Sequence, residues 1–506
     1  RRAGCFSGAG TGRYGGIMKE IFDGERLQAI ERMMQYYRVP GLVFAVFRGD
    51  GEPEMHCLGE KNAEAKTGMD PSTRFCMASI SKSFTAAVVS KLCDEGKLDL
   101  DRPVTDFVPE LRYREKQMTL KDMMSHRSGL ANHDALWPGD KSRAEIARQM
   151  RYLDSNLAFR SKYQYNNTQF VMAGYAAEAV TGRTFEKLLE EYFLGPLGMT
   201  ETSATEAGIK ACGNMAEPYR VFGTTRRRLP FWNMDLAVPA AGVNSSLNDM
   251  VKWVRFHMAG GVTKEGERLL SEKAFREMHT PHIGIDAEPV IAGDPLVLEG
   301  YGLGWRMGTY RGTPFQMHSG KIEGYSSTQI YLPEKNTGFV IMMNLHDPEL
   351  VLFHGIMYDA LDEAAFGIRS SWLSRFSAEM GLIGEHAGYE AYRELFADYT
   401  TPEYKGTDQK QTSGDAHEKE HADLSGTYQN PGYGELTVYK EAGAWMLHYR
   451  DQDLPLLPVS GNRFVMDGVK EDTWILRVPV EFAAGGEGGY EVLVKYDESL
   501  PPVRFS

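Results

Sequence analysis

One stretch of this chain decides its fold: Phe75-Cys76-Met77-Ala78-Ser79-Ile80-Ser81-Lys82-Ser83-Phe84-Thr85, followed directly by the apolar run 86–89. If this region is helical, Ser79 and Lys82 lie on one face, with their Cβ atoms about 5–6 Å apart. A helix N-terminus adds free N–H groups and a partial positive charge. A hydroxyl beside an amine at such a place can act as a nucleophile, because the lysine takes its proton. The same pattern is also typical of an ordinary capped helix with a solvated lysine.

The bulk composition describes a globular protein of several domains. A length of 506 residues favours two to four domains, and a hydrophobic content of 42% supports a sizeable core. The formal net charge of −13 argues against a nucleic-acid-binding protein, which normally carries a basic face. No run of 18 apolar residues occurs, so we expect neither a membrane-spanning helix nor a membrane partner.

The cysteines and the first residues indicate where the protein works. The five cysteines are scattered without a C-x-x-C pair, which favours reduced thiols over disulfides or a metal site: Cys5, Cys57, Cys76, Cys93 and Cys212. Residues 1–17 are glycine-rich and aperiodic, and we expect them to be a disordered leader. They contain no apolar signal-peptide core. These features predict a cytoplasmic protein with no metal ion and no cofactor.

Hydrophobic periodicity predicts a mixed α/β domain over residues 18–368, which also contains the Ser79 stretch. A helix over 24–37 and a buried strand over 41–47 precede the Ser79 helix, and further helices cover 142–153, 168–194 and 248–258. Strand-like runs then follow at 304–310, 315–318, 328–332 and 338–344, before a last helix over 350–365. This order predicts an antiparallel sheet flanked by helices, with a helical subdomain. Residues 205–235 are irregular and long enough for a lid or binding loop.

The pattern changes after residue 368. Residues 369–423 are expected to form a helical connector and a polar linker. Residues 424–506 contain short alternating segments separated by turns rich in Gly, Asp and Pro, which predicts a small all-β, barrel-like domain. We expect this domain to shape or gate the mouth of the active site.

Two later motifs supply partners for the serine and the lysine. An ordinary lysine has a pKa near 10.4, so Lys82 needs burial or a proton relay in order to act as a base. Tyr165 and Asn167, spaced Y-x-N, offer a phenol for proton transfer and an amide for binding. The third motif, His318-Ser319-Gly320-Lys321, stands at the end of a predicted strand. Each of the later motifs is weak alone, because Y-x-N and H-x-G patterns recur elsewhere in the chain.

The ordered set resembles the serine β-lactamase and penicillin-binding-protein superfamily, in particular its class C-related branch of D-aminopeptidases, D-Ala-D-Ala carboxypeptidases and β-lactamase-like esterases. Flanking segments around 120–130, 196–199, 301–305 and 324–327 resemble it too, and the resemblance covers residues 24–365. The last domain resembles the lipocalin-like module that some of these hydrolases carry.

The resemblance implies a role for each motif. Ser79 is the acylated nucleophile, Lys82 and Tyr165 share the base function, and His318 completes the catalytic set. Asn167, Ser319, Gly320 and Lys321 bind the substrate, with Asn167 also holding the lysine. The backbone N–H groups of Ser79 and Lys321 form the oxyanion hole.

One difference from the family's third motif reduces the range of substrates that we expect. Lactam-hydrolysing members usually carry lysine where this chain has His318, and histidine is largely neutral at pH 7. Capture of a substrate carboxylate should therefore be weak unless Lys321 or an arginine from 226–228 compensates.

The resulting prediction is a serine hydrolase that acts through an acyl-enzyme on amide or ester bonds of small molecules or short peptides. A D-aminopeptidase-like and a carboxylesterase-like activity remain open. The alternatives are a β-lactamase, an acyltransferase with the same machinery, or a catalytically silent binding protein. The sequence does not determine the oligomeric state.

Overall fold

The computed structural model describes most of the chain: residues 20–137, 141–222, 225–231, 233–346, 349–379, 423–450, 452–466, 478–486, 489–496 and 500–506. The predicted leader, residues 1–17, and most of the predicted linker, residues 380–422, lie outside these ranges. Within them, no helix is both long enough and apolar enough to cross a membrane.

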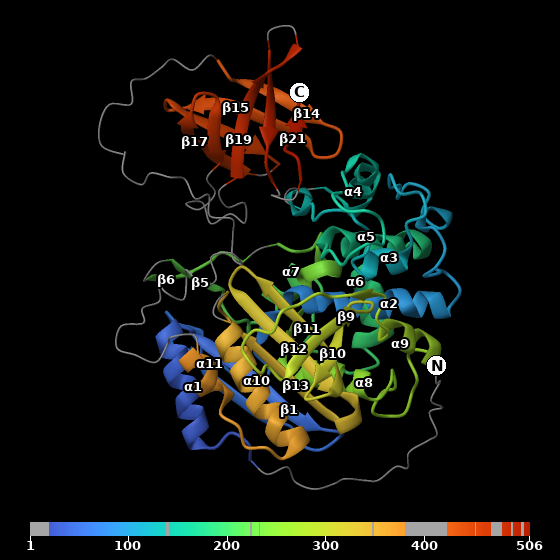
Figure 1. The fold of residues 1–506 in the computed structure, drawn as a ribbon, viewed down its shortest axis with the longest axis vertical. Coiled ribbons are helices and arrows are strands. Elements are labelled where there is room, and N and C mark those ends of the chain that lie inside the picture. Colours follow the sequence, from blue (N-terminus) through green and yellow to red (C-terminus); the bar gives the residue numbers. More distant parts are fainter. Residues whose placement is uncertain are drawn as a thin grey trace.

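The first part of the chain is built on a nine-stranded antiparallel sheet with helices on both faces (Figure 1). In spatial order its strands are β3 (Thr67–Gly68), β2 (Glu54–Asn62), β1 (Gly41–Arg48), β13 (Thr337–Met343), β12 (Tyr325–Leu332), β11 (Thr313–Ile322), β10 (Arg306–Tyr310), β9 (Leu296–Tyr301) and β8 (Ile283–Gly284). One face carries α1 (Gly24–Tyr37), α10 (Glu349–Phe366) and α11 (Trp372–Glu379). The opposite face carries α2 (Ser81–Asp94), α8 (Leu247–Met258) and α9 (Glu272–Met278).

Strand β1 shows why the sheet is covered on both faces. Its first seven residues are all buried. Successive side chains of a strand point to opposite faces. Val43 and Phe47 accordingly pack into the core that contains α2 and α8, whereas Phe44 and Val46 pack into the core that contains α1 and α10. The sheet is therefore the middle layer of three, as the mixed α/β prediction required.

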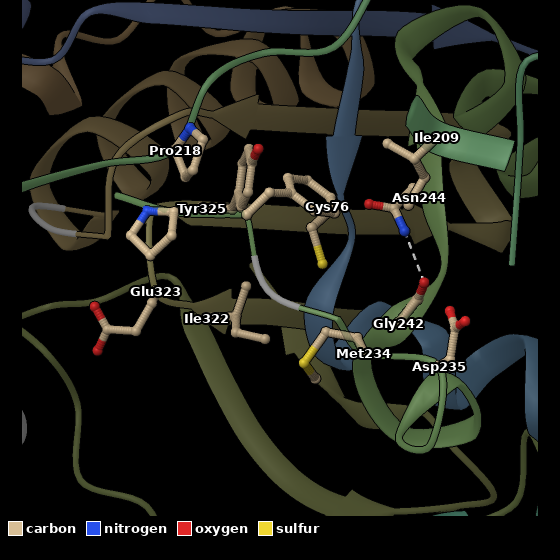
Figure 2. Close-up of a pocket in the computed structure, with 12 residues that line it drawn as sticks. Cys76, Ile209, Pro218, Met234, Asp235, Gly242, Asn244, Ile322, Glu323 and Tyr325 are labelled. Carbon is tan, nitrogen blue, oxygen red and sulfur yellow. Dashed lines mark hydrogen bonds between the residues drawn. The ribbon is translucent and has the colours of Figure 1, made fainter. Parts of the chain in front are cut away.

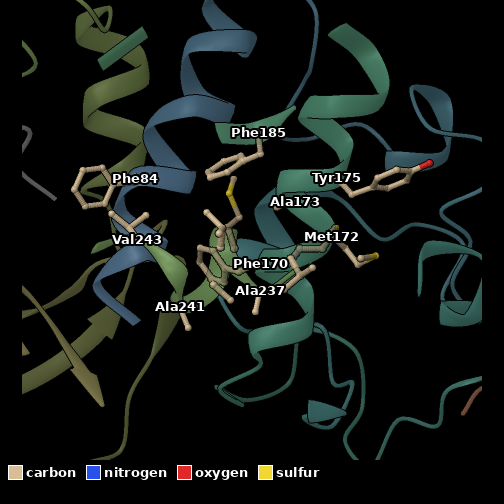
Figure 3. Packing of buried hydrophobic residues seen from close by; sticks show 14 of the residues in the cluster. Phe84, Phe170, Met172, Ala173, Tyr175, Phe185, Ala237, Ala241 and Val243 are labelled. Atoms are coloured by element: carbon tan, nitrogen blue, oxygen red, sulfur yellow. The ribbon is translucent and has the colours of Figure 1, made fainter. Parts of the chain in front are cut away.

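A helical subdomain completes the catalytic part. Its elements are α3 (Leu120–Met124), η3 (Asp134–Leu136), α4 (Arg143–Gln149), η4 (Met150–Tyr152), α5 (Asn167–Thr181), α6 (Phe185–Leu189), η5 (Glu190–Leu194) and the π-helical turn η6 (Val238–Gly242). Figure 3 shows Phe84 of α2 and Phe170 of α5 packed around the same apolar cluster as Ala241 of η6. At Gly174 a Cβ would lie 2.3 Å from the Pro239 ring, so α5 and η6 approach very closely. These contacts fix the elements that carry the predicted motifs.

The C-terminal part is an all-β domain, as predicted. Its strands run in chain order: β14 (Gly426–Asn430), β15 (Gly434–Glu441), β16 (Ala444–Tyr449), β17 (Gln452–Ser460), β18 (Arg463–Met466), β19 (Val478–Ala484), β20 (Tyr490–Val494) and β21 (Val503–Phe505). Gln429 and Ser506 exchange backbone hydrogen bonds of 2.9 and 3.1 Å, which brings the last residues beside the first strand. The result is a nearly closed eight-stranded barrel.

Several predicted boundaries were wrong. The helix predicted over 168–194 ends at Thr181 and is followed by α6 and η5, and the strand predicted at 328–332 begins at Tyr325. The strand predicted at 315–318 extends to Ile322, so His318 lies inside β11 and not at its end. The apolar alternation stops at the polar stretch Ser319–Lys321, although backbone pairing with β12 continues through it. The irregular stretch 205–235 contains α7 (Glu206–Lys210) and a small hairpin of β5 (Tyr219–Phe222) and β6 (Thr225–Arg228).

Candidate active site

Ser79 sits in a short 3₁₀ turn, η1 (Ala78–Ile80), which leads straight into α2. The sequence predicted the first turn of an α-helix, and the structure places the serine just before it. Ala78 is fully buried and has a φ of 45°, in the left-handed region. An alanine there costs roughly 1–2 kcal/mol relative to an ordinary backbone conformation. Such strain clusters at functional sites, where the surrounding structure holds it in place.

Lys82 is fully buried and turns its amine toward the nucleophile. Its Nζ lies 3.0 Å from Ser79 Oγ, 2.7 Å from Asn167 Oδ1 and 2.9 Å from the carbonyl oxygen of Ala240. Burial lowers the pKa of Lys82 well below its usual value, an effect that the Asp134 charge opposes and the Arg306 charge reinforces. A neutral amine is therefore the form that this site favours.

The hydrogen-bond geometry fits a neutral amine that accepts a proton from the serine. The Asn167 oxygen and the Ala240 carbonyl can only accept, so they take both N–H bonds of an unprotonated amine. In the structure Lys82 Nζ donates to Ser79 Oγ at 3.0 Å. When the amine is neutral, its lone pair can take the place of that N–H and accept from the Ser79 hydroxyl. This is the arrangement that general-base activation of a serine requires.

Tyr165 lies on the other side of the serine. Its phenol hydrogen-bonds to Ser79, and its ring lies under the Lys82 amine, 4.7 Å from the ring centroid. Burial raises the pKa of Tyr165, and the Ser79 hydrogen bond and the Arg306 charge only partly offset this. Tyr165 is thus a protonated phenol at neutral pH, suited to pass a proton rather than to start as the base.

Asn167 begins α5 and is held by a network that fixes its amide. Its Nδ2 donates to Asp134 Oδ2 at 3.0 Å, and its backbone N–H donates to Asn132 Oδ1 at 3.0 Å. Asn132 also donates to Asp134 Oδ2, at 2.7 Å. Because an ionised carboxylate only accepts, the Asn167 amide must present its oxygen to Lys82. The sequence missed Asn132 and Asp134, because they precede Asn167 by more than 30 residues and belong to no recognised motif.

His318 is brought close to the other motifs but is closed off from solvent. It is fully buried, and its ring lies 6.4 Å from that of Tyr165. Its Nδ1 faces the Ser319 carbonyl at 2.7 Å and so carries the proton, which leaves Nε2 to accept from the Tyr301 hydroxyl at 2.8 Å. Burial lowers the pKa of His318 well below its usual value, and the Arg306 and Lys82 charges add to this. His318 is therefore a neutral residue behind Tyr165.

The remaining residues of the third motif line the strand beside the serine. Gly320 faces η1 so closely that a Cβ would lie 3.0 Å from the Ser79 backbone nitrogen. The Ser319 hydroxyl accepts a hydrogen bond of 3.0 Å from Thr328, and Lys321 is half-buried. Among the described strands, β10 pairs only with residues 313–317 of β11, so the stretch from His318 to Ile322 has a strand partner on one side only.

The arginine that lies near Ser79 and Lys82 is Arg306, which no sequence motif indicated. Arg306 is the arginine whose charge acts on Lys82, Tyr165 and His318. In the 226–228 segment, Arg226 donates to the backbone carbonyl of Arg38, and Arg228 lies 3.7 Å from Glu217. Arg306 opens β10, and only the folded sheet places it near the site.

A shallow pocket that is open to solvent is lined by Cys76, three residues before Ser79 (Figure 2). Its lining residues are Cys76, Ile209, Pro218, Pro230, Phe231, Met234, Asp235, Gly242, Asn244, Ile322, Glu323 and Tyr325. Ile322 is two residues beyond Gly320 and so projects from the same face of β11. The pocket therefore lies along β11 beyond Gly320, on the side away from Ser79. Asn244 is 2% exposed, and within the described residues its side-chain oxygen has no hydrogen-bond partner.

Comparison with known proteins places this site in a family. The family model described as Beta-lactamase matches residues 27–361. Unguisins hydrolase ungD' of Aspergillus campestris is 24% identical over 494 residues, which cover 92% of this chain and 88% of that protein.

Two solved structures share the fold. An octameric penicillin-binding protein homologue from Pyrococcus abyssi covers 96% of this chain and 99% of its own, at 21% identity and a TM-score of 0.56. A D-stereospecific amidohydrolase from Streptomyces sp. covers 68% of this chain and 99% of its own, at 21% identity and a TM-score of 0.52. With the family model matched from residue 27 to residue 361, the chain belongs to the Beta-lactamase family.

Proposed function

We propose that this protein is a serine hydrolase that forms an acyl-enzyme on Ser79 and cleaves amide or ester bonds of small molecules or short peptides. The observation that carries the proposal is the Lys82 amine, buried and 3.0 Å from the Ser79 hydroxyl. A lysine in that position, with its pKa lowered by burial, is a base at neutral pH.

The steps follow from the positions of these groups. Ser79 Oγ attacks the substrate carbonyl carbon while its proton passes to Lys82 Nζ, and the carbonyl π electrons move onto oxygen. The N–H groups of Ser79 and Lys321, beside the close approach of Gly320, receive that oxyanion. When the C–N or C–O bond breaks, the leaving group takes the proton from Lys82 by way of Tyr165. Water then attacks the acyl group, and the same residues return the proton to Ser79.

The pocket beside Ser79 supports amide substrates that carry hydrogen-bond donors. Its lining includes the carboxylates of Asp235 and Glu323, the Asn244 side-chain oxygen and the Tyr325 hydroxyl, which donates to the Ala216 carbonyl. Glu323 is paired with Arg220 at 2.8 Å, and on the opposite side of the pocket the Asn244 oxygen has no hydrogen-bond partner among the described residues (Figure 2). An ammonium or amide N–H fits this lining better than a carboxylate does. A D-aminopeptidase-like activity is therefore favoured over a carboxylesterase.

Hydrolysis of β-lactams is the weaker candidate. His318 occupies the position where a lysine would meet the substrate carboxylate, and both of its ring nitrogens are engaged inside the protein. A cephalosporin should therefore be turned over much more slowly than an alanine amide.

Two measurements test the proposal. Intact-mass spectrometry after incubation with a fluorophosphonate should show one adduct on the wild type and none on Ser79→Ala; an unlabelled wild type would leave the silent binding protein as the better description. A turnover panel should then compare D- and L-alanine nitroanilides, each with a free and an acetylated amine, with nitrophenyl esters and a chromogenic cephalosporin. Preference for the free amines is the expected result.

A further inference from the structure

The C-terminal barrel contacts the catalytic domain at the loop that holds Asn167. Tyr433, in the turn between β14 and β15, places its hydroxyl 2.5 Å from His133 Nδ1. Tyr449, at the end of β16, donates its hydroxyl to the Ala135 carbonyl at 3.1 Å. Both tyrosines and His133 are 5% exposed or less. The barrel thus contacts the side chain of the residue before Asp134 and the backbone of the residue after it.

The hydrogen bond between Tyr433 and His133 has a defined direction. His133 Nε2 faces the carbonyl oxygen of Asp154 at 3.1 Å, and a carbonyl can only accept. Nε2 therefore carries the proton, and Nδ1 must accept from the Tyr433 hydroxyl. The Tyr449 hydroxyl shares its proton between the Ala135 carbonyl and the Tyr433 carbonyl, which is 3.2 Å away. Tyr449 therefore also holds the backbone of Tyr433 in place.

A series of hydrogen bonds connects residues 132–134 to Ser79. Asn132 and Asp134, which flank His133, bond to the backbone and side chain of Asn167 at 3.0 Å each. Asn167 in turn accepts from Lys82 at 2.7 Å, and Lys82 contacts Ser79 at 3.0 Å. The two contacts made by the barrel are buried, the hydrogen bonds from residues 132 and 134 to Ser79 are partly buried, and the covalent backbone joins the two sets.

We propose that the barrel is a positioning module for the catalytic lysine, with Tyr433 as its principal positioning residue. Its Tyr433 and Tyr449 hydroxyls hold residues 132–135, and these residues orient the Asn167 amide so that its oxygen faces Lys82. This role differs from shaping the mouth of the site, because it acts through the interior of the catalytic domain. It rests on the proposed function only in its consequence for Ser79 reactivity.

The first test is hydrogen exchange on the full-length protein. Tyr433→Phe removes only the hydroxyl, so the barrel should stay folded while the backbone of residues 132–137 exchanges faster than in the wild type. Tyr439→Phe is the matched control, because Tyr439 gives its hydroxyl to Asp453 in an exposed contact of the barrel. Tyr449→Phe should repeat the effect of Tyr433→Phe. Unchanged exchange at 132–137 in both variants would overturn the proposal, whether or not the protein is an enzyme.

The second test measures the consequence at Ser79. The first-order rate of fluorophosphonate labelling should fall about tenfold in Tyr433→Phe, because displacing a catalytic group costs rate steeply. The acid limb of the pH profile should move to lower pH, since the Asn167 oxygen that favours a protonated Lys82 is no longer held.

In an Asn167→Ala background, the Tyr433→Phe change should cause no further loss of labelling rate. An equal loss in both backgrounds would place the effect elsewhere and overturn the proposal. An unlabelled wild type would instead refute the proposed function, and the exchange test would then decide the positioning role.

Discussion

Gly320 of β11 and Met77, two residues before the nucleophile, meet backbone to backbone. A Cβ at residue 320 would lie 2.1 Å from the Met77 carbonyl oxygen and 2.6 Å from Ser327 Oγ. Ser327 itself donates to that carbonyl at 2.9 Å, so the oxygen is held in place. The strand and the nucleophile turn can lie this close only because residue 320 has no side chain.

Gly320→Ala should therefore push β11 away from η1. We expect a loss of about 1–3 kcal/mol in the free energy of unfolding, typical of an overpacked contact. Labelling of Ser79 should slow by roughly a hundredfold, because the oxyanion donors separate. Urea unfolding and timed fluorophosphonate labelling measure the two effects. Gly68→Ala is the control, since its Cβ would meet its nearest backbone atom at 4.0 Å; equal behaviour of the two variants would contradict the close-contact argument.

Lys82→Arg and Lys82→Met should both abolish rapid acylation, for different reasons. A guanidinium stays protonated and cannot take the Ser79 proton, and a thioether has no basic nitrogen. Each should reduce the rate by at least about a hundredfold, the usual contribution of a general base. Single-turnover labelling at saturating reagent is the measurement. A Lys82→Met protein that labels at the wild-type rate would remove Lys82 from the mechanism.

The pH profile of acylation should reflect the buried amine. Burial lowers the pKa of Lys82 well below its usual value, so the neutral, active form is populated at lower pH than it is in an exposed lysine. The rate should rise as the pH increases through this lowered pKa and then stay level. Labelling for fixed times in buffers of increasing pH tests whether the rate rises with pH. A rate that keeps climbing until pH 10 and beyond would mean that Lys82 titrates like an exposed lysine.

Asp122 should be a large contributor to the stability of the helical subdomain. It is fully buried, and its carboxylate lies 2.7 Å from both Arg127 and Arg160. Burial raises the pKa of Asp122, but hydrogen bonds from Arg160, Thr119 and Arg127 outweigh this effect and lower the pKa below the usual value of 3.8. Removing one partner of such a buried network costs about 3–5 kcal/mol, which is the loss we expect for Asp122→Ala.

Asp122 should also determine how the stability of the fold changes with pH in the acid range. Because the folded-state pKa of Asp122 is depressed, its contribution is fully present above the unfolded value near 3.8 and fades as the pH falls through the lower folded pKa. Thermal unfolding of wild type and Asp122→Asn between pH 3 and 7 measures it. The difference in Tm between the two proteins should shrink only at the acid end; a constant difference would exclude this linkage.

The nucleophile and its base were predictable because they are neighbours in the sequence. Ser79 and Lys82 are three residues apart, and helical geometry alone brings them together. The positions of Tyr165 and His318 relative to Ser79 could be inferred only through a resemblance, since they are brought in by α5 and β11. The neutral state of His318 was expected from the sequence, but its burial and its hydrogen bond with the Tyr301 hydroxyl could not be foreseen, because both depend on the folded sheet.

Asn132, Asp134 and Arg306 could not have been found from the sequence. The two loop residues contact Asn167 across 35 and 33 residues of chain, and nothing in their local pattern distinguishes them from surface turn residues. Tertiary packing decides their role. The barrel was predictable as a set of alternating strands, but its contact with the loop depends on single hydroxyl groups of Tyr433 and Tyr449.

The pairing of β1 with β13 has a consequence for the protein during its synthesis. The third residue of β1, Val43, lies opposite Met342, so β1 has to wait for a neighbouring strand that the ribosome makes much later. Pairing between such distant segments forms late in folding, because the loop-closure cost comes first. His318 and Gly320 belong to the same late segment. On the proposed mechanism, we therefore expect a nascent chain that already contains Ser79 and Lys82 to stay unreactive until β13 has left the exit tunnel and closed the sheet.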